Sequence, residues 1–147
     1  MTVIDTTDKG QTDSLSFEFE LRHLPAKVWR ALTEPALLAE WLLPVIEQKL
    51  EPGGALILKK DDPPPGWDGI VNGRYLEIEA HKKLSYSWKV GDIDTVVTFG
   101  LTPTASGTRL SLVQSGFKLQ QKHNLGGARY GWRLMGDKLV DLLARIS

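Results

Sequence analysis

The sequence predicts an α+β domain in which one antiparallel sheet packs against a single long helix at the C-terminal end. Three patterns in the 147 residues predict this class: apolar residues alternate along two regions, two proline-bounded helices separate those regions, and the last segment has helical periodicity. The length suits one domain, so we expect residues 14–147 to form a single domain and residues 1–13 a disordered tail.

The first element is a strand over residues 14–22. Every second residue there is apolar, namely Leu15, Phe17, Phe19 and Leu21. Two short helices follow. The first begins at Pro25, a residue that the first helical turn tolerates, and it ends before Pro35; the second ends before Pro44.

Residues 45–117 predict an antiparallel meander of about six strands, separated by turns that contain glycine or proline. The expected strands are residues 45–50, 55–60, 70–79, 84–90, 97–101 and 110–114. The proline-rich segment 61–66 cannot pair in a sheet, because prolines lack the amide donor, so we expect a stiff surface loop there.

The C-terminal element is predicted to be one amphipathic helix from about Asn124 to Ile146. Its apolar residues recur every three or four positions: Leu125, Ala128, Trp132, Met135, Leu139, Leu143 and Ile146. Such a stripe must be covered. The only large apolar surface that the chain offers is one face of the sheet, so the helix is expected to lie on it.

Composition excludes several classes of protein. Acidic and basic residues balance at 18 each and are interspersed, which argues against a nucleic-acid partner. The absence of cysteine excludes disulfides. The N-terminal segment lacks the features of a signal peptide, and no apolar run approaches the roughly 18 residues that span a bilayer. We therefore expect a cytoplasmic protein without membrane insertion.

Several short segments, in this order, carry a likeness to a known family. They are Pro-Ala-Lys-Val-Trp-Arg-Ala-Leu-Thr at 25–33, Gly-Gly at 53–54, Gly-Arg-Tyr-Leu-Glu-Ile at 73–78, Lys-Leu-Ser-Tyr-Ser-Trp at 83–88, Val-Thr-Phe-Gly-Leu-Thr-Pro at 97–103, Gly-Thr-Arg-Leu-Ser-Leu at 107–112, Ser-Gly-Phe at 115–117 and Gly-Trp at 131–132. With them the chain resembles the START-like superfamily, also called SRPBCC or Bet v-like. Within it the chain is most similar to the bacterial proteins named after the activator of the heat-shock-protein-ninety ATPase.

The resemblance implies the helix-grip fold. In this fold a curved antiparallel sheet of about six to seven strands wraps around the long C-terminal helix, and two short helices follow the first strand. A cavity usually lies between the sheet and the long helix. A core filled by side chains would give the same alternation, so plain packing stays an alternative.

The implied cavity has eleven candidate ligand-binding residues: Trp41, Leu56, Leu58, Tyr75, Glu77, Trp88, Phe99, Gln114, Arg129, Trp132 and Met135. Five tryptophans in so small a domain favour a site with aromatic walls. Trp67, after the proline-rich segment, is a candidate lid. For Glu77 the alternative is a solvent-facing carboxylate paired with a basic residue of a neighbouring strand.

The sequence contains no recognisable catalytic or metal-binding motif. It lacks a Gly-x-Ser-x-Gly elbow and a phosphate loop, and His23, His81 and His123 do not have metal-ligand spacing. We expect surface histidines and no cofactor, with His123 at a pocket mouth as the alternative. The resembling family often has histidine before Ser-Gly-Phe. This chain has Gln114 at that position, and an amide cannot exchange protons near neutral pH.

Three functions follow from these observations. The first is binding of a small hydrophobic molecule such as a lipid, a sterol, a polyketide or an aromatic compound. The second is a co-chaperone that acts on a heat-shock chaperone, as the family name suggests. The third is an enzyme of the cyclase, dehydrase or hydrolase kind, in which Glu77, Tyr75, Arg129 and Gln114 would act. We favour the first, because no catalytic constellation is recognisable.

Overall fold

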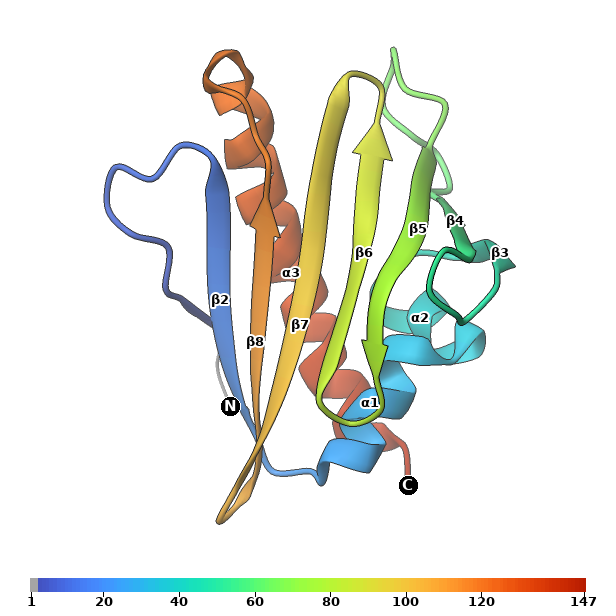
Figure 1. Ribbon diagram of the computed structural model, residues 1–147, viewed down its shortest axis with the longest axis vertical. Coiled ribbons are helices and arrows are strands. Elements are labelled where there is room, and N and C mark those ends of the chain that lie inside the picture. Colours follow the sequence, from blue (N-terminus) through green and yellow to red (C-terminus); the bar gives the residue numbers. More distant parts are fainter. Residues whose placement is uncertain (1–2) are drawn as a thin grey trace.

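The computed structural model describes residues 3–147 and contains one eight-stranded antiparallel sheet that curves around a long helix (Figure 1). The strands are β1 (Val3–Asp5), β2 (Ser14–Leu21), β3 (Val45–Gln48), β4 (Ala55–Lys59), β5 (Ile70–Glu79), β6 (Lys83–Val90), β7 (Ile93–Thr104) and β8 (Gly107–Ser115). The helices are α1 (Pro25–Thr33), α2 (Pro35–Trp41), the short 3-10 helix η1 (Leu119–Gln121) and α3 (Lys122–Arg145). The predicted helix-grip fold is confirmed, with eight strands in place of six to seven.

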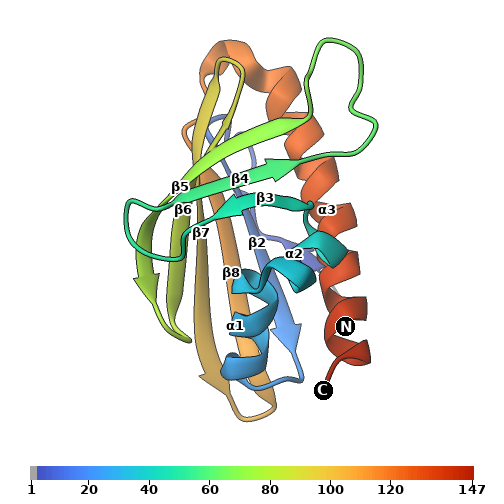
Figure 2. The same ribbon diagram turned by 90° about the vertical axis from the view of Figure 1, so that its right-hand side faces the viewer.

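The strand order is β1-β2-β8-β7-β6-β5-β4-β3, so the first long strand pairs with the last one. Residues of β2 and β8 face each other from Ser14 and Ser115 at one end to Leu21 and Thr108 at the other. The prolines at 25 and 35 start α1 and α2, as predicted. Figure 2 shows all three α-helices on the same, concave side of the sheet.

The core lies between this concave side and α3. Alternate residues of β2 and β7 are buried, as are four of the seven predicted helical positions, Leu125, Trp132, Leu139 and Leu143; Ala128, Met135 and Ile146 are partly buried. Helix and sheet approach each other closely at Gly136. A Cβ at this position would lie 2.8 Å from Cγ2 of Val3 and 3.0 Å from Cε2 of Phe19. The absence of a side chain at 136 therefore lets α3 lie directly on β1 and β2.

The N-terminal segment differs from the predicted disordered tail. Val3–Asp5 form β1, which pairs with β2 through Val3 opposite Phe19 and Asp5 opposite Phe17. Residues 1 and 2 lie outside the described residues. Three strand residues are too short a run for periodicity to reveal, and their partners, Phe17 to Phe19, lie 12 to 16 positions further along the chain.

Asp5 anchors this added strand electrostatically. Its Oδ1 accepts a hydrogen bond of 2.9 Å from the Thr7 amide, and its Oδ2 lies 3.1 Å from Nε of Arg129 on α3. Burial raises the pKa of Asp5, but the hydrogen bonds from Thr7 and the charges of Arg129 and Arg133 outweigh it, and the pKa is below its ordinary value. The carboxylate therefore stabilises the folded state in its charged form.

We expect Asp5→Asn to lower the free energy of unfolding at pH 7 by about 0.5–1 kcal/mol, because the pair is partly exposed and screened. Because the pKa of Asp5 is lower in the folded state than in the unfolded state, its contribution to stability is fully present above the pKa of the unfolded state, near 4. This contribution is lost as the pH falls through the pKa of the folded state. Urea unfolding at pH 7 and at pH 3 measures this. The variant should lose less stability than the parent between the two pH values; an equal loss would contradict the role of Asp5.

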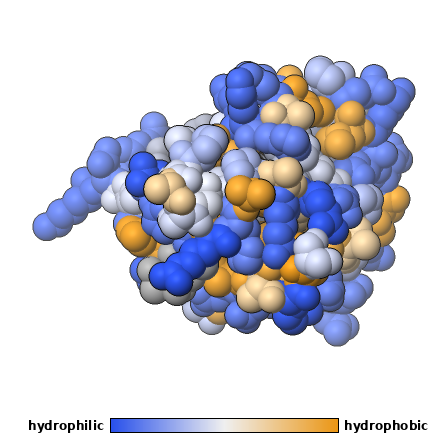
Figure 3. All heavy atoms as spheres, turned by 90° about the horizontal axis from the view of Figure 1, so that it is seen from below, coloured by the Kyte–Doolittle hydropathy of each residue, from blue (hydrophilic) through white to orange (hydrophobic). Residues whose placement is uncertain are grey.

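Charged and apolar residues are mixed on the surface. Seen from the end that carries α1 and the β7–β8 turn, hydrophilic side chains cover much of the molecule, with hydrophobic ones between them (Figure 3). Within residues 3–147, no helix combines the length and the apolar character that crossing a bilayer requires.

Candidate functional site

The loop between β4 and β5, residues 60–69, lies beside α3 (Figure 2). Two adjacent cavities are lined by residues of this loop and of α3. The first has a volume of about 420 Å³ and is lined by Pro64, Trp67, Trp88, Val90, Ile93, Gln114, Phe117, His123, Asn124, Gly127 and Ala128. The second has a volume of about 400 Å³ and is lined by Leu42, Leu43, Lys60, Trp67, Trp88, Gly127, Ala128, Gly131, Leu134, Met135 and Lys138. Four residues line both cavities, so we treat them as one groove, called the α3 groove below.

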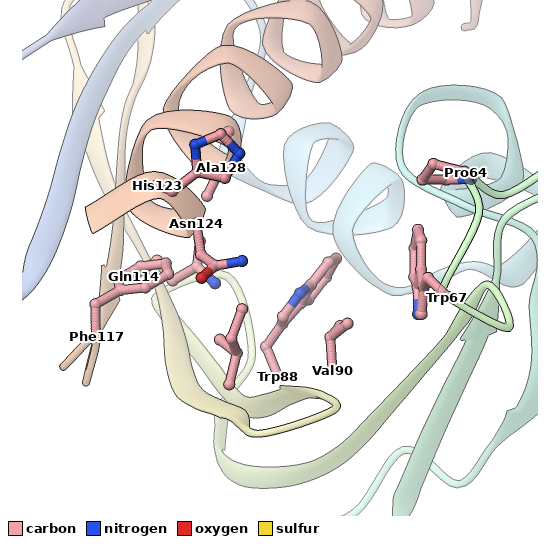
Figure 4. Close-up of a pocket in the computed structure, with 11 residues that line it drawn as sticks. Pro64, Trp67, Trp88, Val90, Gln114, Phe117, His123, Asn124 and Ala128 are labelled. Carbon is pink, nitrogen blue, oxygen red and sulfur yellow. The ribbon is translucent and has the colours of Figure 1, made fainter. Parts of the chain in front are cut away.

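Two tryptophans form the walls where the cavities meet. Trp88 comes from β6, and Trp67 comes from the 60–69 loop and faces the same space (Figure 4). The indole N–H of Trp67 donates to the Ile70 carbonyl at 3.1 Å, which orients the ring. The base of the loop is closed by a 2.8 Å hydrogen bond from the Lys60 amide to the Gly69 carbonyl. One side-chain hydrogen bond therefore fixes the Trp67 ring, and one backbone hydrogen bond fixes the base of the loop that carries it.

The floor of the groove is a stretch of α3 with very small side chains. Gly127 and Ala128 line both cavities, and Gly131 lies one turn further along the second. A Cβ at Gly127 would meet no atom within 4 Å, and one at Gly131 would meet only the Met135 methyl group at 3.9 Å. The backbone of α3 thus leaves open space that a larger residue would fill.

A chain of buried hydrogen bonds connects α3 to the sheet beside the first cavity. The indole Nε1 of Trp132 donates to Oε1 of Gln114 at 2.7 Å, and Nε2 of Gln114 donates to Oγ1 of Thr95 at 2.9 Å. Thr95 in turn donates to the Trp88 carbonyl at 2.9 Å. An indole can only donate, which fixes the orientation of the Gln114 amide. Only one of the two amide hydrogens of Gln114 is bonded to Thr95, so the Gln114 side chain, which lines the first cavity, has a second hydrogen to donate.

The space between the middle of the sheet and α3 is packed with aromatic side chains. The Trp132 ring lies 5.7 Å from Trp88 and 6.4 Å from Phe99, and Phe99 makes an edge contact of 6.3 Å with Trp41. Tyr75 makes an edge contact with a second buried tyrosine, Tyr86, at 5.8 Å. Packing therefore fills the space between the middle of the sheet and α3, and the two cavities of the α3 groove lie beside it.

Neither buried tyrosine suits proton transfer. Burial raises the pKa of the Tyr75 hydroxyl, although a 3.0 Å hydrogen bond from Gln48 partly offsets this. Burial raises the pKa of Tyr86 still more, and the neighbouring Tyr75 adds to the shift. Both hydroxyls stay protonated near neutral pH, so they can serve as hydrogen-bonding groups and not as bases.

The structure brings three of the eleven predicted residues to the α3 groove: Trp88, Gln114 and Met135. Six others are fully or almost fully buried in the packed core, namely Trp41, Leu56, Leu58, Tyr75, Phe99 and Trp132. Trp132 does not line the groove, but it supports two residues that do: its ring contacts Trp88, and its indole N–H holds the Gln114 amide.

Glu77 and Arg129 point elsewhere, contrary to their predicted place in the cavity. Glu77 was expected to share a face with Tyr75, two residues earlier, but the register shifts at a β-bulge between them. The Glu77 side chain is exposed and pairs with Lys83 of β6 at 3.2 Å, which was the alternative considered for it. Arg129 is bound to Asp5 of β1, a strand that the sequence did not reveal.

The three histidines have different surroundings. Nδ1 of His23 lies 3.2 Å from the Lys27 ammonium, and His81 makes an edge contact with Trp29 at 6.2 Å. His123, at the start of α3, lines the first cavity together with Asn124 (Figure 4). Sequence reasoning considered Trp67 of the loop as a lid, and the structure places it in the wall of both cavities. It did not select Asn124, Lys60 or Pro64, because no periodicity indicates where a loop folds back.

Comparison with known proteins agrees with this fold. The family model described as "Activator of Hsp90 ATPase homolog 1-like protein" matches residues 22–144. Among curated proteins, none matches the chain. A solved structure of a Mesorhizobium loti protein is 38% identical, with a TM-score of 0.84, over 91% of this chain and 98% of that one.

More distant solved structures share the architecture. A protein of Chromobacterium violaceum is 26% identical, with a TM-score of 0.77, over 90% of this chain and 98% of that one. CalU16 from Micromonospora echinospora is 23% identical, with a TM-score of 0.72, over 98% of this chain and 85% of that one. The likeness to CalU16 shows the fold alone.

Proposed function

Because the chain belongs to the family of activator of Hsp90 ATPase homolog 1-like proteins, which share this helix-grip fold, we propose that it binds a small, largely apolar molecule in the α3 groove. The observation that carries the proposal is the meeting of the two cavities between Trp67 and Trp88, above a floor without large side chains. Volumes of about 400 Å³ and predominantly apolar walls are typical of small-molecule sites.

Polar groups would orient such a ligand at one end of the groove. Gln114 presents an amide whose orientation Trp132 fixes, and His123 and Asn124 line the same cavity. A few fixed polar groups in an apolar site commonly provide specificity, since a ligand that leaves them unpaired binds less well. We therefore expect the ligand to carry a hydrogen-bond acceptor near Gln114.

The alternatives have weaker support. For an enzyme, two of the four side chains considered as actors, Glu77 and Arg129, lie outside the groove and are occupied in ion pairs. The support for a co-chaperone function is the name of the family. A functional co-chaperone would raise the ATPase rate of a heat-shock chaperone, and it would do so equally after the groove has been filled.

The proposal is tested with N-phenyl-1-naphthylamine, a neutral probe whose fluorescence rises in apolar sites. We expect saturable binding, with energy transfer from the tryptophans of the groove to the probe, and a raised melting temperature. Gly127→Phe should weaken binding about tenfold or more, which corresponds to about 1.4 kcal/mol, because the ring would occupy the floor shared by both cavities.

Gly126→Phe is the matched control. Gly126 is the neighbouring residue of the same helix and has equally open surroundings, but it lines neither cavity. The two substitutions change helix propensity equally, so only the position of the ring differs. Equal effects of the two variants, or no binding by a parent protein that melts cooperatively, would refute binding in the α3 groove.

A further inference from the structure

Charge is distributed unevenly along the α3 groove. The first cavity is lined by neutral polar groups, whereas the second has two ammonium groups, Lys60 and Lys138. Neither cavity is lined by an aspartate or a glutamate. One half of the groove therefore combines apolar walls with two positive charges and no acidic lining residue.

The two lysines come from different elements of the fold. Lys60 follows β4 at the base of the 60–69 loop, where its amide is bonded to Gly69, and Lys138 belongs to α3. Within residues 3–147 neither takes part in an ion pair. This holds although Asp61 neighbours Lys60 and Asp141 is one turn from Lys138 in the helix.

Apolar side chains line the second cavity together with the two lysines and the tryptophans. Leu43 and Met135 line the second cavity, and its walls continue through Trp67 and Trp88 into the first. A molecule that covers this apolar surface has its far end near Lys60 and Lys138. A negative group there would be attracted by two cations, at a site where neighbouring apolar walls reduce screening by water.

Resting on the function proposed above, we propose that the α3 groove selects an apolar organic anion, with its carboxylate or sulfonate between Lys60 and Lys138 and its apolar body against Trp67 and Trp88. The charge complementarity of the second cavity sets the class of ligand. The polar groups of the first cavity, Gln114 among them, would contact the hydrogen-bond acceptor that we expect at the other end of the ligand.

Two probes that share one aromatic body test this. N-phenyl-1-naphthylamine is neutral, and 1-anilinonaphthalene-8-sulfonate carries a sulfonate on the same skeleton. We expect the sulfonate to bind the parent protein about tenfold more tightly at low salt. This preference should shrink in 0.5 M NaCl, where the Debye length falls to a few ångströms.

The double variant Lys60→Gln/Lys138→Gln should weaken binding of the sulfonate about tenfold and change binding of the neutral probe less than about twofold. Lys59→Gln/Lys122→Gln is the control, since it removes the same net charge from residues that line neither cavity. All four positions are exposed, and unchanged melting temperatures establish that each variant is folded.

Each outcome supports or refutes one of the two proposals. If the neutral probe does not bind the parent protein, the proposed function is wrong and the anion preference fails with it. If the neutral probe binds, but the sulfonate has no advantage or keeps it in Lys60→Gln/Lys138→Gln, the preference for an anion alone is refuted. An equal loss in the control variant also refutes it, because net charge would then explain the effect.

Discussion

Trp132→Ala is expected to lower the free energy of unfolding by about 3–5 kcal/mol, the range observed for large aromatic residues removed from well-packed cores. Trp132 is 2% exposed, contacts Trp88 and Phe99, and donates the hydrogen bond that fixes Gln114. Its removal leaves a cavity and an unpaired amide oxygen. Urea unfolding followed by circular dichroism measures the loss, and the melting temperature should fall by about 10 °C.

A double-mutant cycle separates the hydrogen bond from the packing. Trp132→Phe keeps most of the ring but leaves Oε1 of Gln114 buried without its donor, at a cost of about 1–3 kcal/mol. Gln114→Met removes the amide. If the hydrogen bond matters as described, the double variant is less destabilised than the sum of the single ones, by about 1–2 kcal/mol. Additive effects would show that packing alone explains the importance of Trp132.

The regular elements could be predicted because their signals are local. In β2 every second residue is buried, and in α3 the apolar stripe is continuous over several turns. Proline marks the starts of α1 and α2 directly in the sequence. Each of these patterns is determined by neighbours within a few positions, so burial on one face is sufficient to create it.

The candidate site was predictable only in part, because long-range contacts decide where side chains point. The register shift between Tyr75 and Glu77 separates two residues that simple alternation places on the same face. Arg129 is turned toward Asp5, more than a hundred residues away in the sequence. Neither the bulge nor the added strand leaves a periodic signal, since each involves only one to three residues.

Gln114 was predicted from the sequence in one respect and not in another. The sequence identified this position as a departure from the histidine common in the resembling family, and thereby made an acid–base role doubtful. It could not show that the amide would be held by Trp132 and Thr95, from α3 and β7. A buried amide is stable only where its polar atoms find partners, so the partners explain why glutamine is tolerated here.

Gly107→Ala is expected to destabilise the fold by at least about 3 kcal/mol, since strain and steric overlap coincide at this position. Gly107 begins β8 with a φ of +153°. A Cβ there would lie 2.2 Å from the Leu21 carbonyl oxygen and 2.7 Å from the His23 amide nitrogen. Both are backbone atoms at the end of β2, and they cannot retreat without opening the β2–β8 pairing.

Opening the β2–β8 pairing would also break a hydrogen bond next to Gly107. Thr108 faces Leu21 across the two strands, and its hydroxyl donates to the His23 carbonyl at 2.7 Å while its side chain is buried. This contact connects β8 to the entry of α1, so displacement of β2 would disturb both the sheet and the helices. The cost should therefore exceed that of an unfavourable φ alone.

Gly53→Ala separates the two contributions. Gly53 has a φ of +84°, but a Cβ there would meet no atom within 4 Å, so only backbone strain of about 1–2 kcal/mol is expected. Urea unfolding of both variants under the same conditions gives the comparison. A similar loss in the two proteins would mean that β2 moves aside at little cost, and that the close approach of Gly107 does not hold the first and last long strands together.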